Sequence, residues 1–449
     1  MIQSTNIEVA VNPKYKIFAV VTILAAFILL LLHGPQHYTD SEGYLDGVFI
    51  RAPLYPFVID VFRFFFGEYF EYWLVAFQLI LGGWAVHSFC SVVSRQLSLP
   101  PWGFAVTLLL AATPYFGISG QTGNAILSEG LAYPLFLFAM RFLINGIVEV
   151  SFRSIGIFVL FSVLLVLTRK QFLFLFPIAL FAILYFLFRG GGRAKMVYLL
   201  VILVVGGFLA GFIEYTNNYV RHGYFGPFPY TGNQFITMAI YVSKSGDVLA
   251  TRDEQQAKLF QEIYYEASLR KLTLESLGNL HFQGQFINRF QHFFINYGNI
   301  LTTASRAVEK VYFGKSSTTS AKFAIAERET TRLALTLIRE NPLGYAMMYL
   351  LNISYGLGGR DVADGYGMRG NYLALLQFVA LLLLCIYAIP YPRKRPAAVM
   401  MLFMLLLHLA NVAEVALVSL CLDRYTFYTS TVLMVFLAAL ISKGVESLD

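Results

Sequence analysis

The sequence predicts an all-α polytopic membrane protein with about ten transmembrane helices, and two observations carry this prediction. First, hydrophobic residues make up 57% of the 449 and charged residues only 13%, whereas soluble globular domains carry roughly 25% charged residues. Second, apolar runs of nearly bilayer-spanning length recur along the chain. Basic cytoplasmic loops explain the net charge of +7, so we expect no nucleic-acid partner.

Ten apolar runs are candidates for the membrane-spanning helices. They are Ile17–Leu32, Tyr72–Val93, Trp102–Ile118, Leu131–Val148, Phe152–Leu167, Phe172–Phe188, Met196–Ile213, Tyr372–Ile389, Ala397–Leu420 and Tyr425–Ile441. The first run could serve as a signal peptide by its position, but His33-Gly34-Pro35 is not a cleavage site of small residues. We therefore expect this run to be retained as a membrane anchor.

Basic residues in the short loops set the expected orientation, because cytoplasmic loops collect Lys and Arg. With the N-terminus inside, the cytoplasmic cations are Arg95, Arg153, Arg189–Lys195, Arg393–Arg395 and Lys443. An even number of spans with both chain ends inside follows from this pattern. The short run Leu343–Leu357 would move Arg393–Arg395 outside if it crossed the membrane, so we predict an interfacial or re-entrant helix there.

The chain is expected to have three parts. Residues 1–215 form an N-terminal membrane module of seven helices, whose first external loop, residues 33–71, holds the catalytic groups. Residues 216–342 form a mostly helical external segment, and residues 343–449 form a C-terminal module of three helices plus the interfacial or re-entrant helix. Helical spacing in the external segment is clearest at Phe260, Ile263, Tyr264 and Ala267 and at Ala326, Thr330, Leu333 and Leu337. This spacing favours helices on the membrane surface over a separate β domain.

The first external loop is the part of the sequence richest in chemical groups. Asp40, Glu42 and Asp46 follow the first apolar run closely, and a carboxylate there could act as a general base toward a hydroxyl. Arg51 suits a phosphate because its guanidinium can form two parallel hydrogen bonds. Pro53 and Pro56 are expected to make a rigid turn with extended residues before them. Taken alone, the acids fit an ordinary solvated loop better than a catalytic site.

Several short motifs resemble the GT-C superfamily of lipid-carrier glycosyltransferases. The loop contains Asp-x-x-x-Tyr at residues 40–44 and Arg-x-Pro-x-Tyr-Pro at residues 51–56. The further matches are Ser128-Glu129 at the start of the fourth span, Arg169-Lys170 after the fifth, and Asp423-Arg424-Tyr425 at the start of the last. The order of a short first loop and a large external segment after the seventh span is also similar. One departure is Leu54-Tyr55, which stands where the superfamily usually has a small residue before the second proline.

The resemblance implies a GT-C-like helical core and an inverting glycosyltransferase, with a polyprenyl-phosphate-linked sugar as donor. It implies that Asp40 is the catalytic base and that Glu129 orients the acceptor or assists the base. Cations at four positions would hold the lipid phosphate, namely Arg51, Arg169, Lys170 and Arg424, and Glu42, Tyr55 and Tyr425 are further substrate-binding candidates. The acids can serve without a metal ion, and a divalent metal stays open as an alternative.

The expected partners are the donor lipid, a glycan, lipid or protein acceptor, and membrane lipids. The expected location is the inner membrane of a bacterium, with the site facing the periplasm or exterior. The sugar, the acceptor and the oligomeric state do not follow from the sequence.

A polar stripe lies within the ninth apolar run, where His408, Asn411 and Glu414 recur at a spacing of three residues. Ionisable groups inside a membrane are costly and usually face a cavity or a partner. Such groups can also make hydrogen bonds between helices. Both interpretations stay open, and His408 and Glu414 are counted as substrate-binding candidates.

Other functions were weighed against glycosyl transfer. A transporter or lipid flippase would predict two related halves with helices broken by Gly or Pro, and no such duplication is present in the sequence. An O-antigen ligase or polymerase would carry its large external loop later in the chain. A scaffolding role would leave the cations on the external side unexplained.

Overall fold

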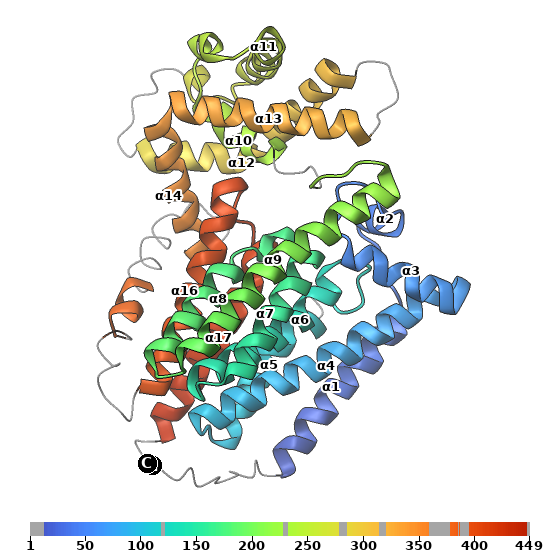
Figure 1. Ribbon diagram of the computed structural model, residues 1–449, viewed down its shortest axis with the longest axis vertical. Helices are drawn as coiled ribbons and strands as arrows, with labels where there is room; N and C mark the ends of the chain where they lie inside the picture. The colour runs from blue at the N-terminus through green and yellow to red at the C-terminus, as the bar shows by residue number, and fades with distance from the viewer. Residues whose placement is uncertain are drawn as a thin grey trace. The chain divides into compact units, whose positions relative to one another are not determined.

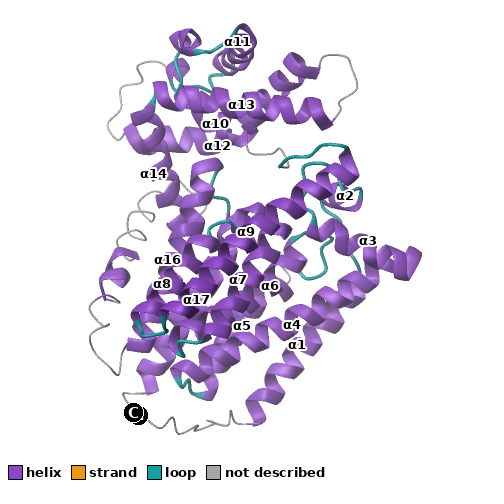
Figure 2. Cartoon of the chain, in the orientation of Figure 1, coloured by secondary structure: helices purple, strands orange, loops and turns teal. Residues whose placement is uncertain are grey.

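The computed structural model describes residues 13–117, 122–227, 232–277, 285–313, 320–358, 378–384, 386 and 395–446. Within these ranges the chain forms helices joined by loops and turns, with no strand (Figure 2). An isolated parallel bridge joins Gln36 to Ala125. The predicted all-α class is therefore confirmed for the described residues.

The chain divides into two compact units, which we describe separately. The first unit comprises Met1–Ile213, Leu381–Ala410 and Phe427–Asp449, and the second comprises Glu214–Ala380 and Asn411–Thr426. Long helices labelled in Figure 1 contribute residues to both units, namely α9 (Arg193–His222), α16 (Arg395–Val418) and α17 (Asp423–Glu446). The other helices of the first unit are α1 (Pro13–His33), α2 (Ser41–Leu45), α3 (Leu54–Phe66), α4 (Phe70–Leu97), α5 (Pro101–Phe116), α6 (Glu129–Val148), α7 (Phe152–Thr168) and α8 (Leu175–Phe188).

Among the described residues, six helical stretches are long and apolar enough to cross a membrane. They are Leu54–Leu97, Glu129–Val148, Lys170–Phe188, Arg193–His222, Pro396–Val418 and Arg424–Gly444. Three shorter apolar helices, Val21–His33, Pro101–Phe116 and Phe152–Thr168, coincide with further predicted spans. These helices agree with an all-α membrane fold. Most of the predicted span Tyr372–Ile389 lies outside the described residues, as do Arg393 and Lys394.

Contacts within the first unit group its helix ends into two sets. At one set of ends, Arg95 in the last turn of α4 pairs with Glu149, directly after α6, at 3.0 Å. The start of α5 belongs to the same set, because a Cβ added to Gly103 would lie 2.8 Å from the side chain of Ser442, near the end of α17. The opposite set joins the end of α1 to the start of α6 through Gln36 and Ala125. Helices α4 and α6 therefore end on the same side of this unit, and α1 ends where α6 begins.

Aromatic side chains pack the interior of the first unit. Tyr115 of α5 stacks on Tyr133 of α6 with ring centroids 5.6 Å apart. Tyr428 of α17 makes edge contacts with Phe136 and Phe172. A Cβ at Gly82 of α4 would fall 2.1 Å from the Tyr115 ring, so glycine is needed where this ring meets α4. This packing fixes the start of α6, where Glu129 lies.

The segment between α1 and α4 differs from the predicted loop, because it contains the helices α2 and α3 and the 3₁₀ turn η1 (Gly67–Tyr69). Pro53 is the N-cap of α3, and Tyr55 and Pro56 lie in its first turn. The expectation of extended backbone before Pro56 was therefore wrong. Proline is tolerated in a first helical turn, because the amides there have no partner within the helix.

The second unit has its own core, built mainly from α10 (Gly232–Val242), α11 (Glu254–Leu269), α12 (Gln285–Val308), α13 (Ser320–Glu340) and α14 (Pro342–Gly358). Phe260, Ile263 and Ala267 of α11 are buried in that core, which confirms the predicted helical spacing. On α13 the residues at the predicted positions, Ala326, Thr330, Leu333 and Leu337, are also buried. Asp253 caps α11 by accepting a hydrogen bond from the Gln256 amide at 2.8 Å.

Helix α14 covers the run for which we predicted an interfacial or re-entrant helix. Its buried polar residues hold the turn after α16. Asn352 donates to the carbonyl oxygens of Ala416 and Ser419, and accepts from the Cys421 amide. The Tyr345 hydroxyl donates to the Leu417 carbonyl oxygen at 2.7 Å. The position of α14 relative to a membrane stays a prediction.

Candidate functional site

A compact turn places the first predicted acid next to the first predicted cation. Helix α2 starts where the Tyr38 amide donates to the Ser41 hydroxyl oxygen, and Asp40 is its N-cap. The chain then turns back, with the Val48 amide donating to Gly43 and the Arg51 amide donating to Val48. As a result Arg51 Nη2 lies 2.9 Å from Asp40 Oδ1. The loop thus joins a carboxylate to a guanidinium eleven positions later in the sequence.

Two neighbours shape the position of the Arg51 guanidinium. A Cβ added to Gly43 would lie 3.0 Å from Arg51 Nε and 3.1 Å from Arg51 Nη2, so glycine lets the guanidinium lie close to the backbone here. On another side, the Arg51 guanidinium carbon lies 4.5 Å from the centroid of the Tyr44 ring. A cation over an aromatic face is attracted by the ring quadrupole. Gly43 and Tyr44 therefore hold Arg51 against Asp40.

The Tyr44 side chain connects this pair to a second one. Its hydroxyl lies 2.8 Å from Ser128 Oγ, just before α6. Ser128 Oγ donates to Glu129 Oε2 at 3.2 Å and accepts from Arg169 Nη1 at 3.4 Å. Arg169, which follows α7, also forms an ion pair with Glu129. Asp40, Arg51, Tyr44, Ser128, Glu129 and Arg169 thus form one continuous chain of polar contacts, which we call the double-pair network.

The two ion pairs of the network differ in exposure. The side chains of Asp40 and Arg51 are 34% and 19% exposed. Those of Glu129 and Arg169 are only 7% and 10% exposed. A small molecule can therefore reach Asp40 more easily than Glu129.

A layer of buried polar contacts supports the network. The Gln36 amide donates to the Asn124 carbonyl oxygen at 2.9 Å, which ties the segment before Asp40 to the segment before Glu129. Gln78 of α4 donates to the carbonyl oxygens of Gly123 and Ala125, and accepts from the Tyr55 hydroxyl at 2.9 Å. The Tyr55 ring meets the Tyr44 ring edge-on at 5.3 Å. Tyr55, predicted to bind substrate, is fully buried and supports Tyr44 in this structure.

The structure thus brings four predicted residues together, Asp40, Arg51, Glu129 and Arg169. Two other candidates lie near the network in the chain: Glu42 is exposed on α2, and Lys170 directly follows Arg169. His408 lies in the first unit, where it is buried and its Nδ1 is 2.9 Å from Thr429 Oγ1.

The remaining candidates, Glu414, Arg424 and Tyr425, belong to the second unit. There the Arg424 guanidinium carbon lies 5.5 Å from the centroid of the Tyr425 ring. Asn411, the third residue of the polar stripe, donates to the Tyr425 carbonyl oxygen at 3.0 Å. This contact joins α16 to α17, as expected if the polar stripe makes hydrogen bonds between helices.

Sequence reasoning missed the roles of several residues. Ser128 was noticed only as part of a motif, although its hydroxyl connects Tyr44 to Glu129. Gly43 and Gln78 gave no functional signal, because their roles depend on contacts with Arg51 and with the chain near residue 125. Among the described residues, no three His, Cys, Asp or Glu side chains are grouped so that they could hold a metal ion.

Comparison with known proteins yields no matching family model, no matching curated protein and no matching solved structure. The resemblance to the GT-C superfamily therefore rests on the sequence motifs. Any function for the double-pair network must be argued from its own geometry.

Proposed function

We propose that this protein is an inverting glycosyltransferase that moves a sugar from a polyprenyl-phosphate carrier to an acceptor hydroxyl on the external face of the membrane. The acceptor is a glycan, lipid or protein. One observation supports this proposal most strongly: the partly exposed Asp40 carboxylate lies 2.9 Å from the Arg51 guanidinium, in the segment that follows α1. A base and a phosphate-binding group are thereby held side by side.

The chemistry requires both groups. Asp40 takes the proton of the acceptor hydroxyl as its oxygen bonds to the anomeric carbon. The bond from that carbon to the carrier phosphate oxygen breaks on the opposite side, which inverts the configuration. The leaving phosphate gains negative charge, and a guanidinium stabilises that charge through paired hydrogen bonds. Arg51 is the cation closest to Asp40 among the contacts above.

The buried pair has a different role in this proposal. Glu129 and Arg169 hold Ser128, and Ser128 holds the Tyr44 hydroxyl. They are therefore positioning residues for Arg51, which rests on the Tyr44 ring. Lys170 and Arg424 are proposed as additional contacts to the lipid phosphate, and Glu42 and Tyr425 as contacts to the sugar or acceptor.

We also propose ten membrane spans with both chain ends inside. The Arg95–Glu149 contact supports this topology, because it joins two helix ends whose basic loops were assigned to the same side. Residues 216–342 would then be external and Arg393–Arg395 cytoplasmic. A membrane-impermeant thiol reagent should label a cysteine introduced at position 270 in intact cells. Labelling of a cysteine at position 394 from outside would overturn the topology.

The direct test of the function has two stages. The full-length protein is purified in mild detergent, and bound lipids are identified by mass spectrometry. It is then reconstituted in liposomes with the lipid-linked sugar that was found, and transfer to externally added acceptors is followed with a radiolabelled sugar. We expect a polyprenyl-phosphate lipid to be bound and its sugar to be transferred. A carrier that moves between leaflets with its sugar still attached would instead identify a flippase.

A further inference from the structure

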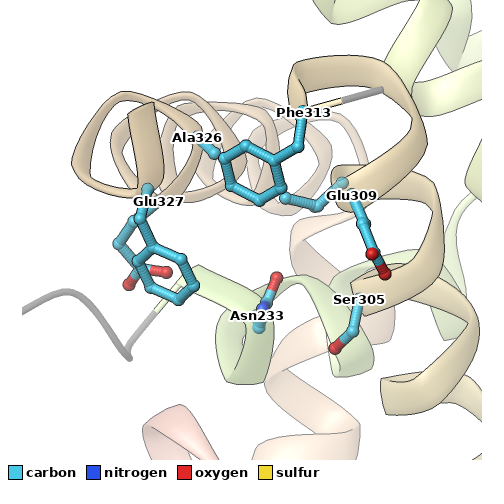
Figure 3. A pocket seen from close by; sticks show the side chains of 8 residues that line it. Asn233, Ser305, Glu309, Phe313, Ala326 and Glu327 are labelled. Carbon is cyan, nitrogen blue, oxygen red and sulfur yellow. The ribbon is translucent and has the colours of Figure 1, made fainter. Parts of the chain in front are cut away.

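The second unit contains a partly open cavity of about 280 Å³, lined by residues of α10, α12, α13 and the π-helical turn η5 (Glu309–Phe313). Its polar lining residues are Asn233, Ser305, Glu309 and Glu327, and its aromatic ones are Phe313 and Phe323. In Figure 3 the two carboxylates lie on either side of the Asn233 amide, with the Phe313 ring above it.

The polar atoms of this cavity mainly accept hydrogen bonds. Asn233 Oδ1 is buried and has no hydrogen-bond partner among the described residues. The Ser305 hydroxyl donates to the Leu301 carbonyl oxygen at 2.9 Å, so its oxygen is left to accept. Glu309 and Glu327 contribute two carboxylates, and the lining residues that the structure describes include no Lys or Arg. The described lining thus offers mainly hydrogen-bond acceptors and carboxylates, which favours a ligand that supplies donors and positive charge.

The apolar part of the lining further restricts the chemical class of the ligand. The Phe313 and Phe323 rings are stacked with centroids 6.1 Å apart and an interplanar angle of 9°. Aromatic faces attract organic cations and also cover methylene groups. A bare metal ion would use the oxygens but would gain little from the two rings.

The geometry also shows why the acceptors stay in place. Glu327 of α13 accepts a hydrogen bond from the Gly232 amide at the start of α10, where a carboxylate complements the helix dipole. A Cβ on Gly232 would lie 2.7 Å from the Glu327 carbonyl oxygen, so the two helices can approach only at glycine. Asn233 follows directly and is thereby aimed into the cavity.

We infer that this cavity is a binding site for a small organic ammonium ion. The ammonium group donates to Asn233 Oδ1 and to the carboxylates of Glu309 and Glu327, and its carbon chain rests on Phe313 and Phe323. The inference does not depend on the proposed glycosyltransferase function, because it uses only residues of the second unit.

The test uses the full-length protein in nanodiscs and n-butylammonium chloride as the probe. Ligand-observed NMR gives the dissociation constant after subtraction of empty nanodiscs, with butan-1-ol as a neutral ligand of the same shape. We expect butylammonium to bind at least about tenfold more tightly than butan-1-ol, because one charge-assisted hydrogen bond accounts for such a factor. Equal binding of the two would overturn the inference, as would displacement of butylammonium by magnesium ions at matched ionic strength.

Variants separate the site from general surface charge. Glu327→Gln keeps the acceptor for the Gly232 amide and should weaken binding about tenfold. Glu309→Gln, at an exposed position that tolerates change, should weaken it about threefold. Asn233→Asp adds a carboxylate and should tighten it.

The matched control is Glu340→Gln at the exposed end of α13, which should change nothing. A loss in this control as large as in Glu327→Gln would show nonspecific attraction and contradict the site. Nanodiscs with phosphatidylethanolamine distinguish the natural source: competition with the probe indicates a lipid headgroup, and no competition indicates a soluble amine.

Discussion

The two ion pairs of the double-pair network have the same chemistry, a carboxylate with a guanidinium, but different surroundings. Asp40 keeps about a third of its side-chain surface exposed, whereas Glu129 keeps 7%. A partly exposed pair contributes little to stability and can open at small cost, about 0–1 kcal/mol. Breaking a buried pair leaves an uncompensated charge and costs about 3–5 kcal/mol. Asp40 and Arg51 can therefore separate and bind groups of the substrate instead. Glu129 and Arg169 stay paired.

The largest expected effect is on stability and concerns the buried pair. Glu129→Ala leaves Arg169 without its ion-pair partner in a nearly closed site, so unfolding should become easier by about 3–5 kcal/mol. Unfolding in mixed micelles with increasing denaturing detergent measures the change. The double variant Glu129→Gln, Arg169→Met removes both charges and should recover much of the loss. A Glu129→Ala protein as stable as the parent would contradict the distinction between the two pairs.

The next effect is on the rate of transfer and concerns the open pair. Asp40→Asn keeps the size of the side chain but cannot take a proton, so sugar transfer should slow by at least about a hundredfold. Donor binding and thermal stability should change little. Asp46→Asn, at an exposed acid of the same loop with no assigned contact to substrate, is the matched control and should stay active. Persistent transfer in Asp40→Asn, together with loss in a stable Glu129→Gln protein, would show that Glu129 is the base.

A smaller effect is expected on donor binding. Arg51→Ala removes a charge-assisted contact to the carrier phosphate, which should weaken binding of polyprenyl phosphate by about 1.5–3 kcal/mol. Arg424→Ala should have the same direction if that residue also contacts the phosphate. Binding is measured by native mass spectrometry in the presence of the short-chain carrier. Arg153→Ala, which removes a cation assigned to the cytoplasmic side, should bind as the parent does.

The smallest effect concerns the path of the Arg51 side chain. Gly43→Ala places a methyl group about 3.0 Å from Arg51 Nε. The guanidinium can shift by a few tenths of an ångström, so transfer should fall only a few-fold and the protein should stay folded. Gly67→Ala is a useful contrast, because its φ of +53° adds backbone strain while the added methyl group has nothing within 4 Å. Its transfer rate per folded molecule should be unchanged.

Local patterns account for what the sequence could predict. The apolar runs and the spacing of Phe260, Ile263 and Ala267 reflect the period of a helix, and helices formed there. The pairing of Asp40 with Arg51 could be predicted from the sequence, because both residues belong to one short loop. The pair of Glu129 and Arg169 was suggested only by separate motifs.

Contacts between distant segments account for what could not be predicted. Gln78 lies 45 residues from Gly123, and no periodic signal links the two positions. The start of α3 at Pro53 was missed for another reason, since proline favours both extended backbone and a first helical turn. Its surroundings, with Tyr55 buried against Gln78, select the helix.

The position of Arg51 between Asp40 and the Tyr44 ring has a consequence for the kinetic order under the proposed function. While Arg51 donates to Asp40, that carboxylate is occupied and is a poor proton acceptor. A carrier phosphate that binds Arg51 would draw the guanidinium away and release the carboxylate. Catalysis would then follow a compulsory order, with donor before acceptor. Acceptor added alone should give no productive complex, and it should not compete with the carrier at equilibrium.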